Sequence, residues 1–112
     1  MVVRDRYTGE KIIISEHALR RAKRRLCFGG NSLVRFARKA FNEGIGFREA
    51  TGKLAKYIKR EYKYFHVANN IRIYGHVVYF FKNNVLLTVL ELPQPLWECW
   101  DNRMRNATLS AT

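Results

Sequence analysis

A histidine followed by a row of basic residues is the first chemically suggestive feature of the sequence, in the stretch ISEHALRRAKRRLCF from Ile14 to Phe28. In a helix, His17, Arg20 and Arg21 would share one side, because residues three and four apart are neighbours on the helical surface. Imidazole transfers protons near neutral pH, and guanidinium groups bind phosphate oxygens. The row therefore predicts a site for a single phosphate. The alternative is the solvated face of an ordinary helix, on which His17 only caps or packs.

Metal-free RNA cleavage requires only groups of this kind. It needs a base for the 2′-hydroxyl proton, a cation for the crowded phosphate and an acid for the leaving 5′-oxygen. We expect His66 in the first strand of a sheet and Thr88 in its last strand to face the His17 helix. The predicted catalytic residues are His17, Arg21, His66 and Thr88. The alternative for His66 is an ordinary strand residue.

Several other kinds of site are disfavoured. The sequence has no Gly-rich phosphate loop, and its three histidines and two cysteines lack the spacing of a zinc site. Nine acidic residues in total, most of them beside basic residues, leave little for paired-carboxylate or two-metal chemistry. We therefore expect neither a metal nor a cofactor.

The positive charge is concentrated in one part of the chain. The net charge is +12, and residues 17–63 hold fourteen basic and three acidic side chains, or +11 of that total. Such clustering creates a field that attracts polyanions, so RNA or another nucleic acid, the ribosome or an acidic protein is the expected partner. A general solubilising charge is the alternative. The predicted nucleic-acid contacts are Arg20, Arg24, Arg25, Arg35, Arg38, Lys39 and Arg72.

Length and composition predict one domain, residues 1–112, since a chain of this size builds a single core. Cys27 and Cys99 are too few and too far apart for a disulfide scaffold, which favours a reduced, cytoplasmic protein. The N-terminus carries charges where a signal peptide needs apolar residues, and no run approaches the roughly 18 apolar residues of a membrane span. We expect no membrane association.

Residues 1–14 are predicted to form a hairpin with a turn near Gly9, and residues 15–62 a basic helical part. Ser15 is the expected N-cap of a first helix that buries Leu19, Ala22 and Leu26 and ends at Gly29 and Gly30. A second helix follows from about residue 31 to Gly44. A third is expected over residues 47–61, weakened by an internal glycine at position 52.

Residues 63–92 are predicted to form an antiparallel meander. Its expected strands are YKYFHVA, IRIYGHVVYFF and VLLTVLEL, joined at asparagine turns and with a bulge at Gly75. The last strand is apolar on both alternations, which favours a central position. Residues 93–112 are a C-terminal extension in which Trp97 and Trp100 cap the core or form a partner patch. The predicted fold is α+β: two to three N-terminal helices packed on a three- to four-stranded antiparallel meander.

The motif S-x-H-A-x-x-R in IISEHALRRAKRR, together with a meander ending VLLTVLELP, resembles the RelE-like toxin superfamily over residues 11–93. The resemblance implies a RelE-like fold and a metal-independent endoribonuclease, or a relative that kept only the RNA-binding surface. Matching positions are His17, Arg20 or Arg21, and Thr88. The family also implies an acidic antitoxin partner. Two features depart from the family: a third helical pattern, and a segment after Pro93 without the basic, aromatic end of ribosome-dependent relatives.

Two functions are therefore weighed. The first is an RNA-binding, toxin-like endoribonuclease with a His/Arg site. The alternative is non-enzymatic: a phage or mobile-element regulator that binds nucleic acid, or a basic inhibitor of an acidic protein. Convergence of His17, Arg21, His66 and Thr88 around one cleft would favour the first, because general bases act only within hydrogen-bond reach.

Overall fold

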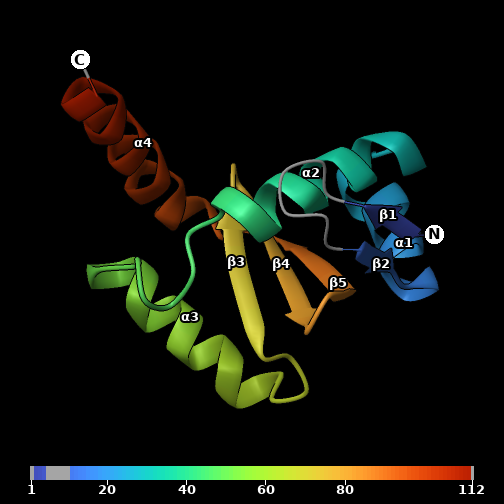
Figure 1. The fold of residues 1–112 in the computed structure, drawn as a ribbon. Helices are drawn as coiled ribbons and strands as arrows, with labels where there is room; N and C mark the ends of the chain where they lie inside the picture. Colours follow the sequence, from blue (N-terminus) through green and yellow to red (C-terminus); the bar gives the residue numbers. More distant parts are fainter. Residues whose placement is uncertain (1, 5–10, 112) are drawn as a thin grey trace.

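The computed structural model describes residues 2–4 and 11–111 and has an α+β fold with helices on both faces of a sheet (Figure 1). The sheet has five strands in the order β1-β2-β5-β4-β3. Strands β1 (Val2–Arg4) and β2 (Lys11–Ile14) pair antiparallel. The predicted turn near Gly9 lies outside the described residues. The α+β class is confirmed, and the helices lie on two faces of the sheet.

The prediction of a purely antiparallel sheet of three or four strands is wrong. Strand β5 (Val85–Glu91) pairs antiparallel with β4 (Val77–Lys82) but parallel with β2, through Ile13 opposite Val85 and Ile14 opposite Leu86. Because β5 is apolar on both faces, it is stable only in the middle of the sheet, and β2 covers the edge that β4 leaves open. The direction of that pairing depends on the path of three intervening helices, which no local pattern reveals.

The first helix begins where the sequence predicts. Helix α1 (Glu16–Arg21) starts after Ser15, whose Oγ accepts a hydrogen bond from the Ala18 amide at 3.1 Å. It continues into a π-helical turn, η1 (Ala22–Leu26), and ends at Cys27, which has a left-handed φ of 56°. The predicted end at the glycine pair is therefore wrong: Gly29 instead precedes α2 as its N-cap.

Helix α2 (Gly30–Glu43) buries Leu33, Ala37 and Ala40 and ends before Gly44, as predicted. Helix α3 (Gly52–Tyr64) begins five residues later than the expected start at 47 and runs three residues past the expected end at 61. Its first residue, Gly52, has a left-handed φ of 57°, so this glycine marks the helix start and not a weak interior position.

The meander is present, but its first strand is displaced. Strand β3 (Asn70–Tyr74) is followed by a two-residue turn at Gly75 and then by β4, so the expected long strand is in fact a hairpin. Gly75 has a left-handed φ of 65°, which this tight turn requires. The bulge lies elsewhere, where the β4–β5 register shifts between Phe80 and Phe81. The segment YKYFHVA is no strand: it forms the end of α3 and a turn.

Two cores lie on opposite faces of the sheet, since successive strand residues point to opposite faces. In β4, Val78 and Phe80 pack beneath α3 and α4 (Trp97–Ala111), which follows the 3₁₀ turn η2 (Gln94–Leu96). Tyr79 and Phe81 pack beneath α1 and α2 (Figure 1). Trp100 is 8% exposed and belongs to the first core, which favours the core-capping interpretation for this residue over a partner patch.

Candidate functional site

Helix α1 replaces β2 as the neighbour of the central strand. After Ile14 the chain leaves the sheet, and the Ser15 amide donates to the Leu86 carbonyl at 3.1 Å. The Ser15 hydroxyl also donates to the Leu87 carbonyl at 3.0 Å while it caps the helix. One side chain thus begins α1 and attaches it to β5, which fixes where the next residues of the helix stand.

Arg21 attaches the other end of α1 to the same strand. Its Nε donates to the carbonyl oxygen of Val89 at 2.8 Å, a group that a neighbouring strand would otherwise bind. The guanidinium is half-buried, and among the described residues its two terminal Nη groups have no partner. A guanidinium held through Nε keeps its Nη donors in a fixed orientation, ready for an anion.

A groove of about 260 Å³ lies between α1, the strands β4 and β5, and the end of α3. Thr88 on β5 is the only buried polar side chain in the described part of the chain, with 8% of its surface exposed. His17 is exposed, and Tyr64 is 78% exposed at the mouth of the groove. The lining residues are His17, Arg21, Glu61, Tyr64, Phe65, Phe80, Thr88 and Leu90. We name this site the α1–β5 groove.

A second depression of about 210 Å³ adjoins the α1–β5 groove. It shares His17 and Arg21 with that groove, and no acidic side chain lines it. Positive charge without a nearby carboxylate attracts polyanions strongly. Its lining residues are His17, Arg20, Arg21, Arg24 and Arg25, and we name it the arginine depression.

Three of the four predicted catalytic residues, His17, Arg21 and Thr88, line the α1–β5 groove together. His66 does not line this groove: it is exposed in the turn that follows α3. The predicted strand position of His66 is wrong, because α3 continues to Tyr64 and His66 lies in the turn after it, before the first strand of the meander begins.

Sequence reasoning missed Glu61, which α3 contributes to the groove together with Tyr64, a residue expected either to stack on bases or to lie in the core. Their spacing of three residues places them on one side of a helix, a signal that was available once residues 61–64 were read as helical. Glu61 also acts on its neighbour: burial, and then the negative charge of Glu61, raise the pKa of Tyr57 to about 12, although Arg60 opposes this. Because Glu61 and His17 line the same groove, the site holds a carboxylate in addition to the imidazole, guanidinium and hydroxyl groups that the sequence predicts.

The predicted nucleic-acid contacts fall into three places. Arg20, Arg24 and Arg25 line the arginine depression. Arg35, Arg38 and Lys39 lie on α2. Arg35 stacks over the Phe36 ring at 5.3 Å, and the buried Nε of Arg38 has no hydrogen-bond partner among the residues that the structure describes.

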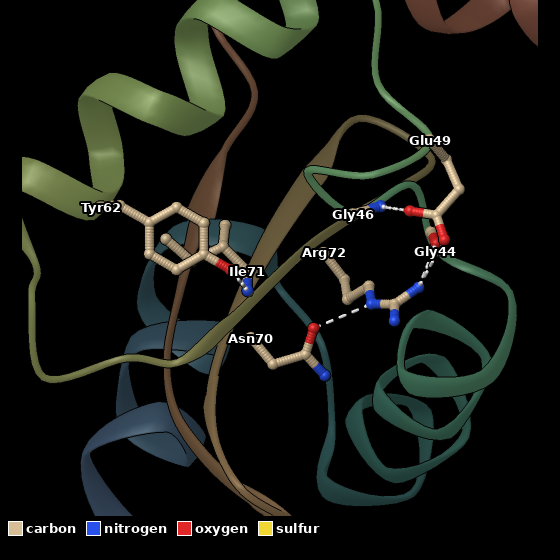
Figure 2. A network of polar contacts seen from close by, with 7 residues as sticks. All are labelled: Gly44, Gly46, Glu49, Tyr62, Asn70, Ile71 and Arg72. Atoms are coloured by element: carbon tan, nitrogen blue, oxygen red, sulfur yellow. Dashed lines mark hydrogen bonds and ion pairs between the residues drawn. The ribbon is translucent and has the colours of Figure 1, made fainter.

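Arg72 lies on the edge strand β3, whereas the groove is lined by residues of β4 and β5. Its guanidinium donates to the Gly44 carbonyl and to Asn70 Oδ1, both at 2.9 Å (Figure 2). It lines a different pocket, so it does not extend the surface formed by α1.

Within the described residues, no three His, Cys, Asp or Glu side chains gather in a way that could hold a metal ion. None of the described helices has both the length and the apolar character that a bilayer crossing demands. Comparisons with protein-family models, curated proteins and solved structures returned no match.

Proposed function

We propose that this chain binds single-stranded RNA through the arginine depression and cleaves it, without a metal, in the α1–β5 groove. One observation carries the proposal: His17 and Arg21 line both sites, so a phosphate held by the arginines would lie beside an imidazole, a carboxylate and a hydroxyl. The reaction agrees with the activity that the RelE-like resemblance implies. Ribosome-bound RNA and an acidic antitoxin-like protein are the further partners included in this proposal.

The proposed reaction is an internal transesterification. Glu61 takes the proton of the ribose 2′-hydroxyl as its oxygen attacks phosphorus, and the bond from phosphorus to the 5′-oxygen breaks. His17, in its protonated form, gives a proton to that leaving oxygen. The products are a 2′,3′-cyclic phosphate and a 5′-hydroxyl, and water then takes the proton from Glu61 and gives one to His17, which restores both groups. The free Nη donors of Arg21 would stabilise the charge on the equatorial phosphate oxygens.

The groove residues fit these roles by environment. Thr88 offers a hydroxyl in a largely apolar wall formed with Phe80 and Leu90, where electrostatic contacts are stronger than in water. Tyr64, which is 78% exposed, offers a ring on which a base next to the scissile phosphate could stack.

The test is cleavage of end-labelled RNA in the presence of EDTA. Wild type is expected to cleave, and a strand with 2′-deoxyribose throughout is expected to stay intact because it lacks the nucleophile. His17→Ala is expected to slow cleavage by about 100-fold or more. Lys23→Ala, which changes an exposed cation on the same helical segment outside both sites, is expected to keep the wild-type rate. Intact RNA with wild type, or unchanged cleavage by His17→Ala, would refute the enzymatic proposal.

The non-enzymatic alternative has one observation in its favour: only one of the two predicted histidines reaches the groove. A regulator that binds nucleic acid would show RNA or DNA affinity that falls steeply with salt but no cleavage. A basic inhibitor of an acidic protein would bind neither nucleic acid. The same samples, measured for binding as well as cleavage, separate the three functions.

A further inference from the structure

A pocket of about 370 Å³ lies beside the edge strand β3, on the opposite flank of α3 from the α1–β5 groove. It is bounded by the loop between α2 and α3, by α3 and by β3. The side chains that matter here are Phe47, Arg48, Lys59, Tyr62, Asn70 and Arg72. We name it the β3 pocket.

The polar base of the pocket is held in place by several contacts. Arg72 donates through Nε to Asn70 Oδ1 and through Nη1 to the Gly44 carbonyl, both at 2.9 Å (Figure 2). Glu49 approaches the guanidinium to 3.8 Å and accepts from the Gly46 amide at 3.0 Å. A Cβ at Gly46 would lie 3.2 Å from Arg72 Nε, so a side chain there would require the guanidinium to shift by a few tenths of an ångström.

This arrangement leaves two donors without a partner in the described residues, Nη2 of Arg72 and Nδ2 of Asn70. Neither atom has a dashed line in Figure 2. Because Glu49 offsets the charge of Arg72, the two groups offer neighbouring N–H donors with little net charge. Such a pair suits a neutral group with two adjacent acceptors better than it suits a phosphate.

Aromatic and cationic side chains surround these donors. The apolar ring of Phe47 is 51% exposed, and a flat ligand that stacked on it would shield this ring from water. The Tyr62 ring is fixed because its hydroxyl accepts a hydrogen bond from the Ile71 amide at 2.9 Å. Arg48 and Lys59 are both exposed and can contact phosphates on either side of a bound base.

We propose that the β3 pocket holds one unpaired guanine of the bound RNA, stacked on Phe47, with its O6 and N7 accepting from Arg72 and Asn70. Adenine is disfavoured because an amino donor replaces O6 on the same edge. The proposal rests on the proposed RNA-binding function and adds sequence preference to it. An acidic peptide, whose carboxylate also presents two acceptors, is the competing occupant.

The test measures affinity for uridine decamers that carry one central guanine or adenine, with 2′-O-methyl ribose throughout so that cleavage cannot consume them. Wild type is expected to prefer the guanine strand by about tenfold, as for a specific two-bond base contact. Substitution of 7-deazaguanine, which lacks the N7 acceptor, is expected to remove most of that preference.

Two protein variants separate the hydrogen bonds from the stacking. Asn70→Asp keeps the acceptor that binds Arg72 but loses the amide donor, so the ratio of guanine to adenine affinity is expected to fall to one or below. Phe47→Leu keeps apolar surface but loses the aromatic ring, and is expected to weaken both purine strands by about fivefold or more. Val67→Ala is the matched control, because Val67 is equally exposed, at 49%, but lies outside the pocket.

Equal affinity for the two purine strands, or a guanine preference that survives Asn70→Asp, would overturn the proposal. So would polyglutamate that displaces the guanine strand as strongly as unlabelled guanine strand does. The thermal midpoint Tm with guanosine or adenosine monophosphate tests the pocket independently of RNA. If RNA does not bind but guanosine monophosphate alone raises Tm, and Phe47→Leu removes the rise, the pocket proposal stands and the RNA function fails. No RNA affinity and no change in Tm would overturn both.

Discussion

Ser15→Ala is the sharpest probe of how the site is positioned, because one hydroxyl makes two contacts. It accepts from the Ala18 amide at 3.1 Å and donates to the Leu87 carbonyl at 3.0 Å. Loss of an N-cap costs about 1 kcal/mol, and loss of a partly buried hydrogen bond about another 1 kcal/mol. We expect the free energy of unfolding to fall by about 2 kcal/mol.

The assay is urea unfolding monitored by circular dichroism. The urea midpoints are compared after checking that the dependence of the unfolding free energy on urea concentration is the same in each variant. Ser15→Thr retains a hydroxyl and should recover most of the loss. Ser32→Ala is the matched control: Ser32 lies in the first turn of α2, but Gly29 is the N-cap there. Its substitution is expected to change stability by less than about 0.5 kcal/mol, as for most surface positions.

Equal effects of Ser15→Ala and Ser32→Ala would refute this reasoning, because the structure gives a capping bond to only one of the two serines. An RNA-cleavage rate unaffected by Ser15→Ala would refute the positional part of the account. That part holds that the Ser15 contact with β5 fixes where His17 stands.

Three further predictions address other parts of the molecule. Burial raises the pKa of Tyr57 to about 12, so stability should fall as the pH rises from 10 to 12, and Tyr57 should contribute up to about 2–3 kcal/mol of that loss. Burial also raises the pKa of Tyr79, which adds to the loss over the same range. Tyr57→Phe should therefore remove only the Tyr57 share, and Tyr64→Phe, at an exposed tyrosine, should leave the loss unchanged. Gly44→Ala should destabilise by about 1–3 kcal/mol in urea unfolding, because its Cβ would lie 2.5 Å from a main-chain oxygen of α2; a neutral result contradicts the described loop. Replacing Arg24 and Arg25 together by glutamine should reduce the slope of log affinity for single-stranded RNA against log salt by about 1.4, and an unchanged slope excludes them from phosphate contact.

Local signals in the sequence predicted those features of the fold that depend on a few neighbouring residues. Ser15 caps a helix because its hydroxyl reaches an amide three residues ahead, and Gly44 ends one. Asn83 adopts a φ of 54° in the β4–β5 turn, as expected of asparagine in a tight hairpin. Each of these three features depends on residues within about four positions along the chain.

Features that depend on distant contacts were not predictable in this way. The segment YKYFHVA has strand-like composition, yet the Tyr62 hydroxyl binds the Ile71 amide, a tertiary contact that helps keep Tyr62 in the last turns of α3. The parallel pairing of β2 with β5 joins residues about 70 positions apart. Glu61 lines the α1–β5 groove because α3 extends to Tyr64, beyond its predicted end.

The most direct test of the central claim is the single-turnover cleavage rate of RNA by His17→Ala and by His66→Ala, with binding measured on the same samples. The account predicts that His17→Ala loses about 100-fold or more, the usual contribution of a general acid or base, and that its affinity for RNA changes little. It predicts that His66→Ala stays within about twofold of wild type, because His66 lies outside the groove. Equal losses in the two variants, or a larger loss in His66→Ala, would contradict an active site in the α1–β5 groove.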